Sequence, residues 1–385
     1  MPGSQASLRE ANRARTLAVL RRLGPLTQVE VARATGLSPA TVSNIVKELS
    51  ASGVLQVERT TSSGGRRASR VSLSRSLGVA VGVDFGHRHL SVAVGDLAHE
   101  VLGERRVPLP AEHRWEEGLD LAAGLVEELV REAGGPDGAV LAVGLGLPGP
   151  VDADVRGVGS PTLLPGWVGV DVVAEMSRRT GAPVHVDNDA NLGALAEWHW
   201  GAARGQDDVV YLKLAHGVGA GLVIGGRLFR GRRGTAGEFG HTTIDEAGRI
   251  CRCGGRGCLE TYVRAGVLVD MLRASHGPVT LAEVVQGARD GDPGCRRVVS
   301  DAGRHVGVAL ASLCNLLDPE RVVVGGELAT AGDVLLDPLR EVVHRVAIHT
   351  GGGGVEVVAA ELGERAEVLG ALALALEQSA GVPVG

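Results

Sequence analysis

The first fifty residues show the apolar spacing of three short amphipathic helices. In residues 13–23 apolar positions recur every three or four residues, which predicts one buried stripe of Leu17, Val19, Leu20 and Leu23. Thr27 and Glu30 have the spacing of a capping box, so a second helix is predicted to begin there. Gly36 is expected to end it, and its buried side is predicted to consist of Val29, Ala32 and Leu37.

A third helix is predicted to begin at Ser38-Pro39, because serine caps free amides and proline fits the first helical position. One face of this helix is apolar and contains Val42, Ile45, Val46 and Leu49. The opposite face is short-chained, polar and nearly uncharged, and it contains Ser38, Ala40, Thr41, Ser43, Asn44 and Lys47. Small polar groups of this kind can reach base edges in the major groove of DNA.

Two short strands are predicted after the third helix, at residues 54–57 and 70–73. A basic loop rich in glycine and serine, residues 59–67, connects them. Three helices followed by such a loop predict a winged helix-turn-helix over residues 1–75, in which Arg66 and Arg67 contact phosphates or the minor groove. A helical protein-interaction module is the alternative, but the caps, the turn, the polar face and the basic loop all favour DNA binding.

From residue 77 onward, short apolar runs alternate with glycine-rich turns. Strands are predicted at residues 79–84, 89–94, 139–147, 183–186, 209–214 and 321–324, helices at 119–132 and 192–200, and a hairpin at 217–228. This alternation predicts an α/β architecture with polar groups at the strand ends. The sequence contains no P-loop and no dinucleotide fingerprint, which excludes those nucleotide-binding folds.

Charge separates the two parts of the chain. Residues 1–75 carry a net charge of +8 and the remaining 310 residues carry −14. The basic part can approach a polyanion such as double-stranded DNA, which repels the acidic part. Few aromatic residues, 2% of the chain, weaken the case for stacking on single-stranded nucleic acid. The sequence has no apolar run near the roughly 18 residues of a membrane span and no signal-peptide core, so a cytoplasmic protein without a membrane partner is expected.

The most specific pattern is a histidine followed by three cysteines within 18 positions. Three thiolates and one imidazole suit a closed tetrahedral Zn²⁺ site, whose predicted ligands are His241, Cys251, Cys253 and Cys258. Four protein ligands leave no open position, so this zinc is expected to be structural. A redox thiol group is the alternative, although the Cys-x-Cys spacing is not that of a redox Cys-x-x-Cys. Cys295 and Cys314 lie apart and are expected to be ordinary buried thiols.

Residues 238–241 read Glu-Phe-Gly-His and residues 251–260 read Cys-Arg-Cys-Gly-Gly-Arg-Gly-Cys-Leu-Glu. This pair of segments resembles the signature of the ROK family, which contains repressors, open reading frames and sugar kinases. The loops at 148–152 and 188–191 also resemble family loops. The resemblance implies a two-lobed, actin-like (ribonuclease H-like) ROK domain over residues 78–385, with the zinc motif inserted at 238–260 and a sugar cleft between the lobes. With the winged helix in front, the chain is similar to the repressor branch.

The resemblance also implies a set of sugar-binding residues: Gly149 through its main chain, and Asn188, Asp189, Glu238, His241 and Glu260. Carboxylates and amides can bind vicinal hydroxyls. His241 can bind zinc with one ring nitrogen and direct the other N–H at a hydroxyl. A supporting role around zinc stays open for Glu238 and Glu260. In the kinases, the residue that matches Asp189 is the general base.

Two phosphate-binding loops depart from the kinase pattern. Residues 84–88 read Asp-Phe-Gly-His-Arg where the kinases resemble Asp-x-Gly-Gly-Thr, and the bulk of His87 is expected to obstruct phosphates. Residues 217–223 read Gly-Val-Gly-Ala-Gly-Leu-Val where the kinases resemble Gly-Thr-Gly-x-Gly-Gly-Gly. Since phosphoryl transfer depends on these cradles, we expect a protein without a catalytic residue, in which Asp189 serves as a hydroxyl ligand.

The sequence therefore predicts a sugar-responsive, DNA-binding transcriptional regulator, a repressor without kinase activity. Its expected partners are a double-stranded DNA operator and a sugar or sugar-phosphate effector. A homodimer or homotetramer is expected, because palindromic operators require two reading heads. Two alternatives stay open: an active ATP-dependent sugar kinase fused to a DNA-binding domain, and a DNA-binding protein whose sugar cleft is vestigial.

Overall fold

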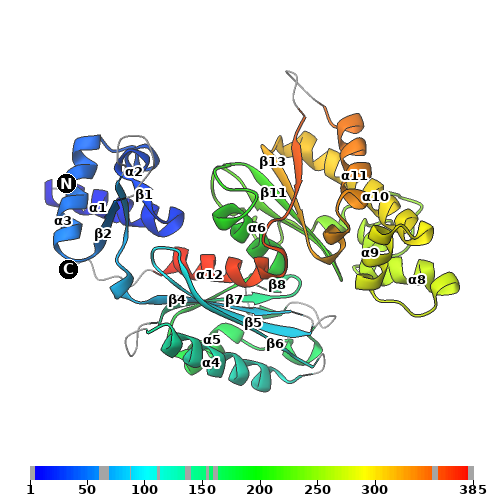
Figure 1. Ribbon diagram of the computed structural model, residues 1–385, viewed down its shortest axis with the longest axis horizontal. Coiled ribbons are helices and arrows are strands. Elements are labelled where there is room, and N and C mark those ends of the chain that lie inside the picture. The colour runs from blue at the N-terminus through cyan, green and yellow to red at the C-terminus, as the bar shows by residue number, and fades with distance from the viewer. Residues whose placement is uncertain are drawn as a thin grey trace. The chain divides into compact units, whose positions relative to one another are not determined.

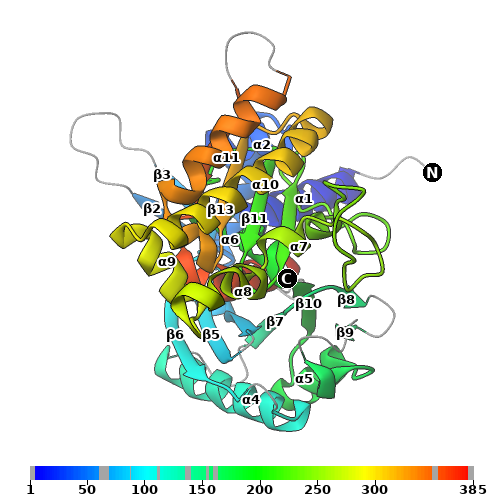
Figure 2. The same cartoon turned by 90° about the vertical axis from the view of Figure 1, so that its right-hand side faces the viewer.

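The computed structural model describes residues 5–59, 69–86, 88–110, 113–134, 140–152, 156–158, 164–348 and 354–379 (Figures 1 and 2). Contacts between residues divide the chain into two compact units. The first contains Met1–Gly146, Val170–Val186 and Ala371–Gly385, and the second contains Leu147–Gly169 and Asp187–Gly370. The predicted contact residues Arg66 and Arg67 and the predicted obstruction His87 lie outside the described residues.

The first unit begins with the predicted winged helix. Its elements are α1 (Gln5–Leu23), β1 (Leu26–Thr27), α2 (Gln28–Thr35), α3 (Pro39–Ala51), β2 (Leu55–Arg59) and β3 (Ser69–Leu73). The three strands form one sheet in the order β1-β3-β2. Both predicted caps are present: the Thr27 side chain accepts a hydrogen bond from the Glu30 N–H, and the Ser38 side chain accepts one from the Thr41 N–H.

The sequence prediction was wrong about the buried side of α2 and about the start of α1. Val29 is 75% exposed, whereas Val31 is fully buried. Val31 and Thr35 lie four residues apart and form the buried stripe of α2. The first half of α1 is polar and has no apolar stripe, so the sequence pattern did not predict that the helix begins there. The Arg9 guanidinium connects this half to α3 through an ion pair with Glu48 at 2.6 Å.

A five-stranded sheet forms the rest of the first unit. The strands are β4 (Val79–Phe85), β5 (His89–Asp96), β6 (Val101–Pro108), β7 (Val140–Leu147) and β10 (Val184–Asn188), in the order β10-β7-β4-β5-β6. Strands β4 and β7 run parallel, and the β4-β5 and β5-β6 pairs are antiparallel. The edge strand β6 was not predicted, because its residues alternate between half-buried and exposed positions. A short 3-10 turn, Arg75–Leu77, links this sheet to the winged helix.

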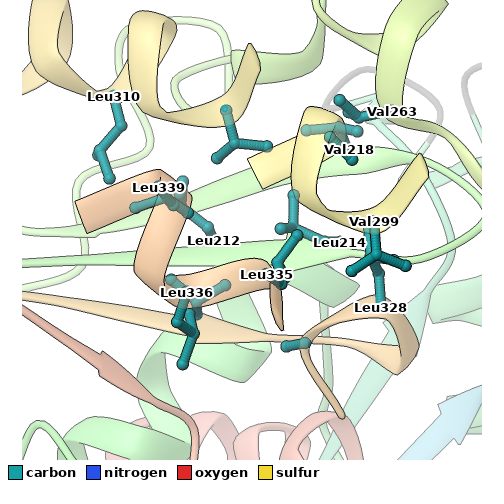
Figure 3. Close-up of a cluster of buried hydrophobic side chains, with 14 of the residues drawn as sticks. Leu212, Leu214, Val218, Val263, Val299, Leu310, Leu328, Leu335, Leu336 and Leu339 are labelled. Atoms are coloured by element: carbon teal, nitrogen blue, oxygen red, sulfur yellow. The ribbon is translucent and has the colours of Figure 1, made fainter. Parts of the chain in front are cut away.

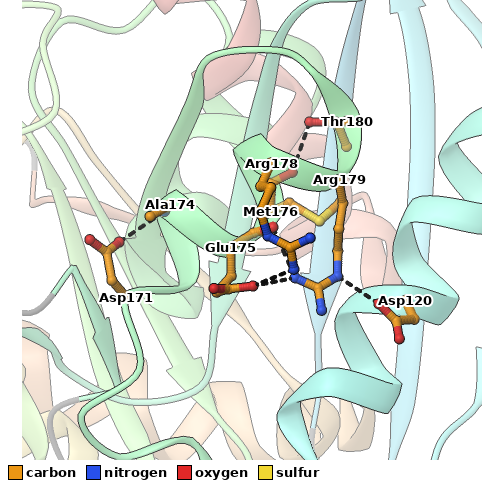
Figure 4. Close-up of polar contacts among 8 residues, drawn as sticks. All are labelled: Asp120, Asp171, Ala174, Glu175, Met176, Arg178, Arg179 and Thr180. Carbon is orange, nitrogen blue, oxygen red and sulfur yellow. Dashed lines mark hydrogen bonds and ion pairs between the residues drawn. The ribbon is translucent and has the colours of Figure 1, made fainter.

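Two helices, α4 (Trp115–Glu132) and α5 (Val172–Thr180), pack beside this sheet. Ion pairs supplement their apolar contact: Arg179 on α5 lies 2.7 Å from Asp120 on α4 and 2.6 Å from Glu175 on its own helix (Figure 4). The Asp171 side chain caps α5 by accepting a hydrogen bond from the Ala174 N–H.

The second unit contains a four-stranded sheet in the order β12-β11-β13-β14. Its strands are β11 (Val209–Leu214), β12 (Val218–Val223), β13 (Arg321–Gly325) and β14 (Glu356–Ala359), and a two-stranded ribbon pairs β8 (Val151–Asp152) with β9 (Gly157–Val158). The α-helices are α6 (Asp189–Trp200), α7 (Glu260–Val263), α8 (Ala265–His276), α9 (Leu281–Asp290), α10 (Pro293–Leu317) and α11 (Asp333–Val346). The last described helix is α12 (Ala366–Gln378), and further 3-10 turns cover Pro165–Trp167, Phe239–His241, Glu327–Ala331 and Gly363–Arg365.

The pleat of β11 separates the two faces of this sheet. Leu212 and Leu214 point into a core that also contains Leu310 of α10 and Leu339 of α11 (Figure 3). Tyr211 points the other way, and its ring lies so close to α6 that a side chain at Gly193 would collide with it. No helix among the described residues is long and apolar enough to cross a membrane.

Candidate functional site

Four predicted metal ligands converge in the second unit. His241 ends a 3-10 turn, and the three cysteines follow in a loop whose turns depend on glycine: Gly254 has a φ of 89° and Gly257 a φ of 64°. The Cys251 Sγ lies 3.6 Å from His241 Nδ1, and the Cys253 and Cys258 sulfurs lie 3.7 Å apart. All four ligand atoms lie within 4.8 Å of one another, and none of the cysteines forms a disulfide.

The chemistry of this cysteine loop (residues 251–258) fits a soft divalent cation. Burial raises the pKa of the Cys258 thiol to about 12, so its ionisation requires a positive charge nearby. The Gly255 N–H donates to Cys253 Sγ and lowers the pKa of that thiol. Three sulfurs and one imidazole nitrogen at this spacing match the donor set and geometry that Zn²⁺ prefers.

A second group of metal-ligand type, His276, Asp292 and Cys295, has its ligand atoms within 4.8 Å of one another. Helix capping accounts for it, because Asp292 Oδ1 accepts the Cys295 N–H at 2.8 Å and faces His276 Nε2 at 3.1 Å. Cys295 and Cys314 are buried, as predicted, and burial raises the pKa of each thiol to about 11.

Three of the predicted sugar ligands lie beside the cysteine loop. His241 turns Nδ1 toward Cys251, while its Nε2 lies 3.9 Å from Glu238 Oε2. Burial raises the pKa of the Glu238 carboxyl, and the nearby carboxylates of Asp189 and Glu260 raise it further. Asp189 and Glu260 therefore both lie within electrostatic range of Glu238.

The start of α6 supplies the remaining polar groups. The Asn188 Oδ1 caps this helix by accepting the Asn191 N–H at 2.7 Å. Asp189 follows as the first helical residue, and its Oδ2 accepts a hydrogen bond from Lys213 Nζ at 3.0 Å. The same Lys213 Nζ lies 2.6 Å from Glu367 Oε1.

The two other predicted positions differ in their surroundings. Glu260 is 2% exposed and forms a two-point ion pair with Arg252, a residue of the cysteine loop. Gly149 lies in the turn between β7 and β8 with a φ of 81°, a conformation that favours glycine. Its contact with a ligand stays a prediction.

Sequence reasoning missed three charged residues of this region: Lys213, Arg252 and Arg230, whose Nε lies 2.6 Å from Asp187 Oδ2. Lys213 offered a signal, since it is one of only two lysines in the chain. Arg252 also stood inside the Cys-x-Cys motif. Glu260 lies 8 positions from Arg252, Asp189 lies 24 from Lys213 and Asp187 lies 43 from Arg230. Glu367, the second partner of Lys213, is more distant still, so the motif alone does not reveal the pairs.

The two segments compared with kinase phosphate loops make close contacts within this chain. The His89 ring covers Gly86 so closely that a Cβ there would collide with it, and His89 Nε2 lies 3.3 Å from Asp84 Oδ2. Residues 218–223, inside the predicted hairpin, form strand β12, which pairs antiparallel with β11. Gly219 and Gly221 permit close packing of that strand on Ala190 of α6. The turn itself contains residues 215–217, where the Ala215 N–H donates to the Gly217 carbonyl.

The predicted DNA-contact residues of α3 share one side of that helix. The buried side of α3 consists of Val42, Ile45, Val46 and Leu49, as predicted. The opposite side is exposed at Ser38, Ala40, Ser43, Asn44 and Lys47 and half-buried at Thr41. A helix that presents short polar groups and one lysine to solvent fits the recognition helix of a winged helix-turn-helix.

Comparison with known proteins agrees with both parts of the chain. The profile of the ROK family matches residues 80–378, and that of the MarR family matches residues 10–68. This chain belongs to the ROK family. Its two units therefore form an actin-like (ribonuclease H-like) ROK fold with a MarR-type winged helix in front.

Full-length relatives of this ROK protein are transcriptional regulators. The xylose repressor of Caldicellulosiruptor bescii is 28% identical over 99% of both chains. The crystal structure of a ROK family transcriptional regulator, a homologue of the E. coli Mlc protein, is 26% identical with a TM-score of 0.77 and covers 97% of this chain and 96% of its own. A ROK family glucokinase from Streptomyces griseus, solved with glucose and AMPPNP, is 32% identical with a TM-score of 0.67, but covers 77% of this chain and 99% of its own.

Proposed function

We propose that this protein is a sugar-responsive transcriptional repressor that binds an operator through its winged helix and a sugar through its ROK domain. The observation that carries the proposal is the combination of an exposed polar recognition helix with a cluster of carboxylates beside a Zn²⁺-type ligand set. The similarity to repressors over nearly the whole chain supports it. The similarity to the S. griseus glucokinase covers 77% of this chain.

The proposed sugar ligands are Gly149, Asn188, Asp189, Glu238, His241 and Glu260. Carboxylates accept hydrogen bonds from neighbouring sugar hydroxyls, and the Asn188 amide can donate to a ring or hydroxyl oxygen. A structural Zn²⁺ held by His241, Cys251, Cys253 and Cys258 would fix the His241 ring, whose Nε2 faces the carboxylates. The proposed domain division is 1–75 for DNA binding and 78–385 for sugar binding.

The proposed regulation follows from linkage between the two sites. A sugar changes operator affinity only if it binds the DNA-competent and DNA-incompetent conformations with different affinities. A homodimer or homotetramer is proposed, since a change in the spacing of two winged helices releases both half-sites of an operator together. The proposed DNA contacts are Ser38, Ala40, Thr41, Ser43, Asn44, Lys47, Arg66 and Arg67.

Three features support the absence of kinase activity. The ammonium of Lys213 forms an ion pair with Asp189, the residue that matches the kinase base. The His89 ring covers Gly86 in the first loop, and the glycines of β12 are used for helix packing. These contacts give Asp189 a cationic partner and place side chains close to the backbone of both segments.

A thermal-shift screen tests this function. Purified protein is heated with D-glucose, D-xylose, N-acetylglucosamine and their phosphates, with and without ATP, and hits are examined by mobility shift on operator DNA. We expect one sugar to raise Tm without ATP and to change DNA affinity. A response to no sugar would favour a vestigial site.

Active sugar phosphorylation is the second candidate, favoured by the similarity to the S. griseus glucokinase. A coupled assay with ATP and the same sugars distinguishes the two functions. Turnover that Asp189→Ala abolishes would replace the repressor-only function with that of a DNA-binding kinase. We expect no turnover above that of the Asp189→Ala variant.

A further inference from the structure

Arg252 connects the cysteine loop to the most deeply buried acidic residue of the proposed sugar site. It stands between two metal-ligand residues, Cys251 and Cys253. Its Nε lies 2.8 Å from Glu260 Oε1, and its Nη2 donates to Glu260 Oε2 at 3.1 Å. The fork therefore engages both carboxylate oxygens and fixes the plane of the carboxylate as well as its place.

The loop fixes the Glu260 backbone by a separate route. Cys258 lies two residues before Glu260, and the intervening Leu259 N–H donates to the Thr242 carbonyl at 2.9 Å. Thr242 in turn follows His241. The predicted metal ligands His241 and Cys258 therefore flank the two chain segments whose hydrogen bond holds the backbone next to Glu260. Within the loop, the Cys251 N–H donates to the Gly255 carbonyl at 2.8 Å and orients the chain next to Arg252.

The ion pair has a physical reason beyond stabilising the loop. The Glu260 side chain is 3% exposed, so its charge requires compensation in the fold. Each carboxylate oxygen has about two acceptor positions, and the guanidinium uses one on each oxygen. The other acceptor positions stay available to hydroxyl groups. The Arg252 side chain is 38% exposed and reaches the carboxylate from the solvent side.

Neighbouring charges make the orientation of Glu260 matter for a ligand. The Glu260 carboxylate raises the pKa of the Glu238 carboxyl, and the Arg252 guanidinium lowers it. A Glu260 carboxylate released from Arg252 would turn away from the other acidic side chains because like charges repel. A lysine could neutralise the charge but could not engage both oxygens in one plane.

We propose that Arg252 is a positioning residue that presents the Glu260 carboxylate to the sugar, so that the cysteine loop sets sugar affinity through this ion pair in addition to His241. The inference rests on the proposed sugar function and gives the metal loop a second route to the ligand. It also predicts a selective role: Arg252 controls recognition of the hydroxyl that Glu260 binds, while other hydroxyls are recognised independently.

The test compares the full-length wild-type protein with Arg252→Met, Arg252→Lys and the control Arg249→Met. Arg249 is an exposed arginine just before the loop. Calorimetry measures affinity for D-glucose or D-xylose, whichever stabilises the wild type, and for its 1-, 2- and 3-deoxy analogues. Metal content and Tm are recorded for every variant.

We expect Arg252→Met to bind the parent sugar about tenfold more weakly, which corresponds to about 1.4 kcal/mol. Its metal content should equal that of the wild type. Removing the hydroxyl that contacts Glu260 should weaken sugar binding to the wild type strongly. The same removal should weaken binding to Arg252→Met by less than about twofold, because a displaced carboxylate no longer accepts a hydrogen bond from that hydroxyl. Arg252→Lys should restore part of the affinity, and Arg249→Met should behave as the wild type.

Two results would overturn the inference while the proposed function stands: sugar affinity of Arg252→Met equal to that of the wild type, or an equal loss for every deoxy analogue together with loss of metal. The second result would make Arg252 a structural residue of the loop. A wild-type protein that binds none of the sugars would overturn the proposed function and this inference together.

Discussion

The Lys213 ammonium donates a hydrogen bond to the Asp189 carboxylate across 3.0 Å. It also pairs with Glu367, and the side chains of Lys213 and Glu367 are mostly buried. One cation therefore neutralises two acidic groups at the start of α6 and of α12. In the kinases the residue that matches Asp189 is the general base, whereas here the Asp189 carboxylate has the Lys213 ammonium as a direct partner.

Replacing Lys213 by methionine should destabilise the second unit and weaken sugar binding. Without the ammonium, Asp189 and Glu367 lose their compensating charge, and we expect the free energy of unfolding to fall by about 1–3 kcal/mol. Thermal melting and calorimetry with sugar measure both effects. The matched control is Lys47→Met, since Lys47 is exposed on α3. Unchanged melting and sugar affinity in Lys213→Met would contradict this role.

Replacing Cys253 by serine should remove the metal. The wild type is expected to hold one Zn²⁺ per chain, and Cys253→Ser close to none, because a hydroxyl is a poor ligand for a site built from sulfur. Metal analysis of dialysed protein measures this, and Tm should fall with the metal since binding and folding are linked. Cys314→Ala, at a buried thiol outside the cluster, should keep full occupancy. Full occupancy in Cys253→Ser would refute the ligand assignment.

Replacing Lys47 or Arg66 by alanine should weaken DNA binding and reduce its dependence on salt. Each phosphate contact that is lost lowers the slope of log affinity against log salt by about one. Fluorescence anisotropy on a random-sequence duplex, measured from low to physiological salt, gives the slope. Arg204→Ala, at an exposed site in the second unit, serves as the control. Identical slopes for Lys47→Ala and the wild type would remove Lys47 from the interface.

Replacing Arg75 by alanine should destabilise the first unit in a pH-dependent way. Asp96 is 1% exposed, and burial raises the pKa of its carboxyl, while Arg75, at 3.0 Å, opposes this rise. The stability associated with a raised pKa is complete below the pKa of unfolded aspartate, about 3.9, and is lost as pH rises through the folded pKa. Without Arg75 the pKa rises further, so more stability is lost on reaching neutral pH.

The difference in Tm between wild type and Arg75→Ala should therefore be smallest at pH 4.5 and largest at pH 7.5. Arg131→Ala is the control, because Arg131 and Glu127 form a pair exposed to solvent and should contribute little at either pH. A difference that stays constant over this range would show that Arg75 does not stabilise the ionised Asp96.

Much of the winged helix could be predicted because its signals are local. The Thr27 and Glu30 capping box and the Ser38 cap depend on residues three positions apart, and the structure confirms both. The buried face of α2 could not be assigned in the same way. Val29 and Val31 are equally apolar, and only the packing of α2 against its neighbours decides that Val31 is inside.

The second unit shows the same division. The glycines at 219 and 221 lie in β12, inside the predicted hairpin at 217–228, where α6 approaches too closely for side chains. A glycine-rich segment has the same sequence pattern whether its backbone contacts a phosphate or packs on a helix, because both contacts require the absence of a Cβ. Helix α6, which packs on these glycines, begins 28 positions before Gly217. A pattern of neighbouring residues therefore does not predict this contact.

The amino-acid sequence by itself determined which chemical groups this protein has. It also determined the local features that depend on neighbouring residues, which are the helix caps, the glycine turns and the alternation of apolar and polar positions. The cysteine spacing predicts which thiols lie together, because few residues separate them and the chain between them has few conformations. Only the tertiary structure decided which charges meet: Lys213 with Asp189, Arg252 with Glu260, Arg75 with Asp96. Each pair is formed by elements that converge through the burial of apolar side chains elsewhere, and burial is non-directional, so the pairs follow from the packing of the whole unit.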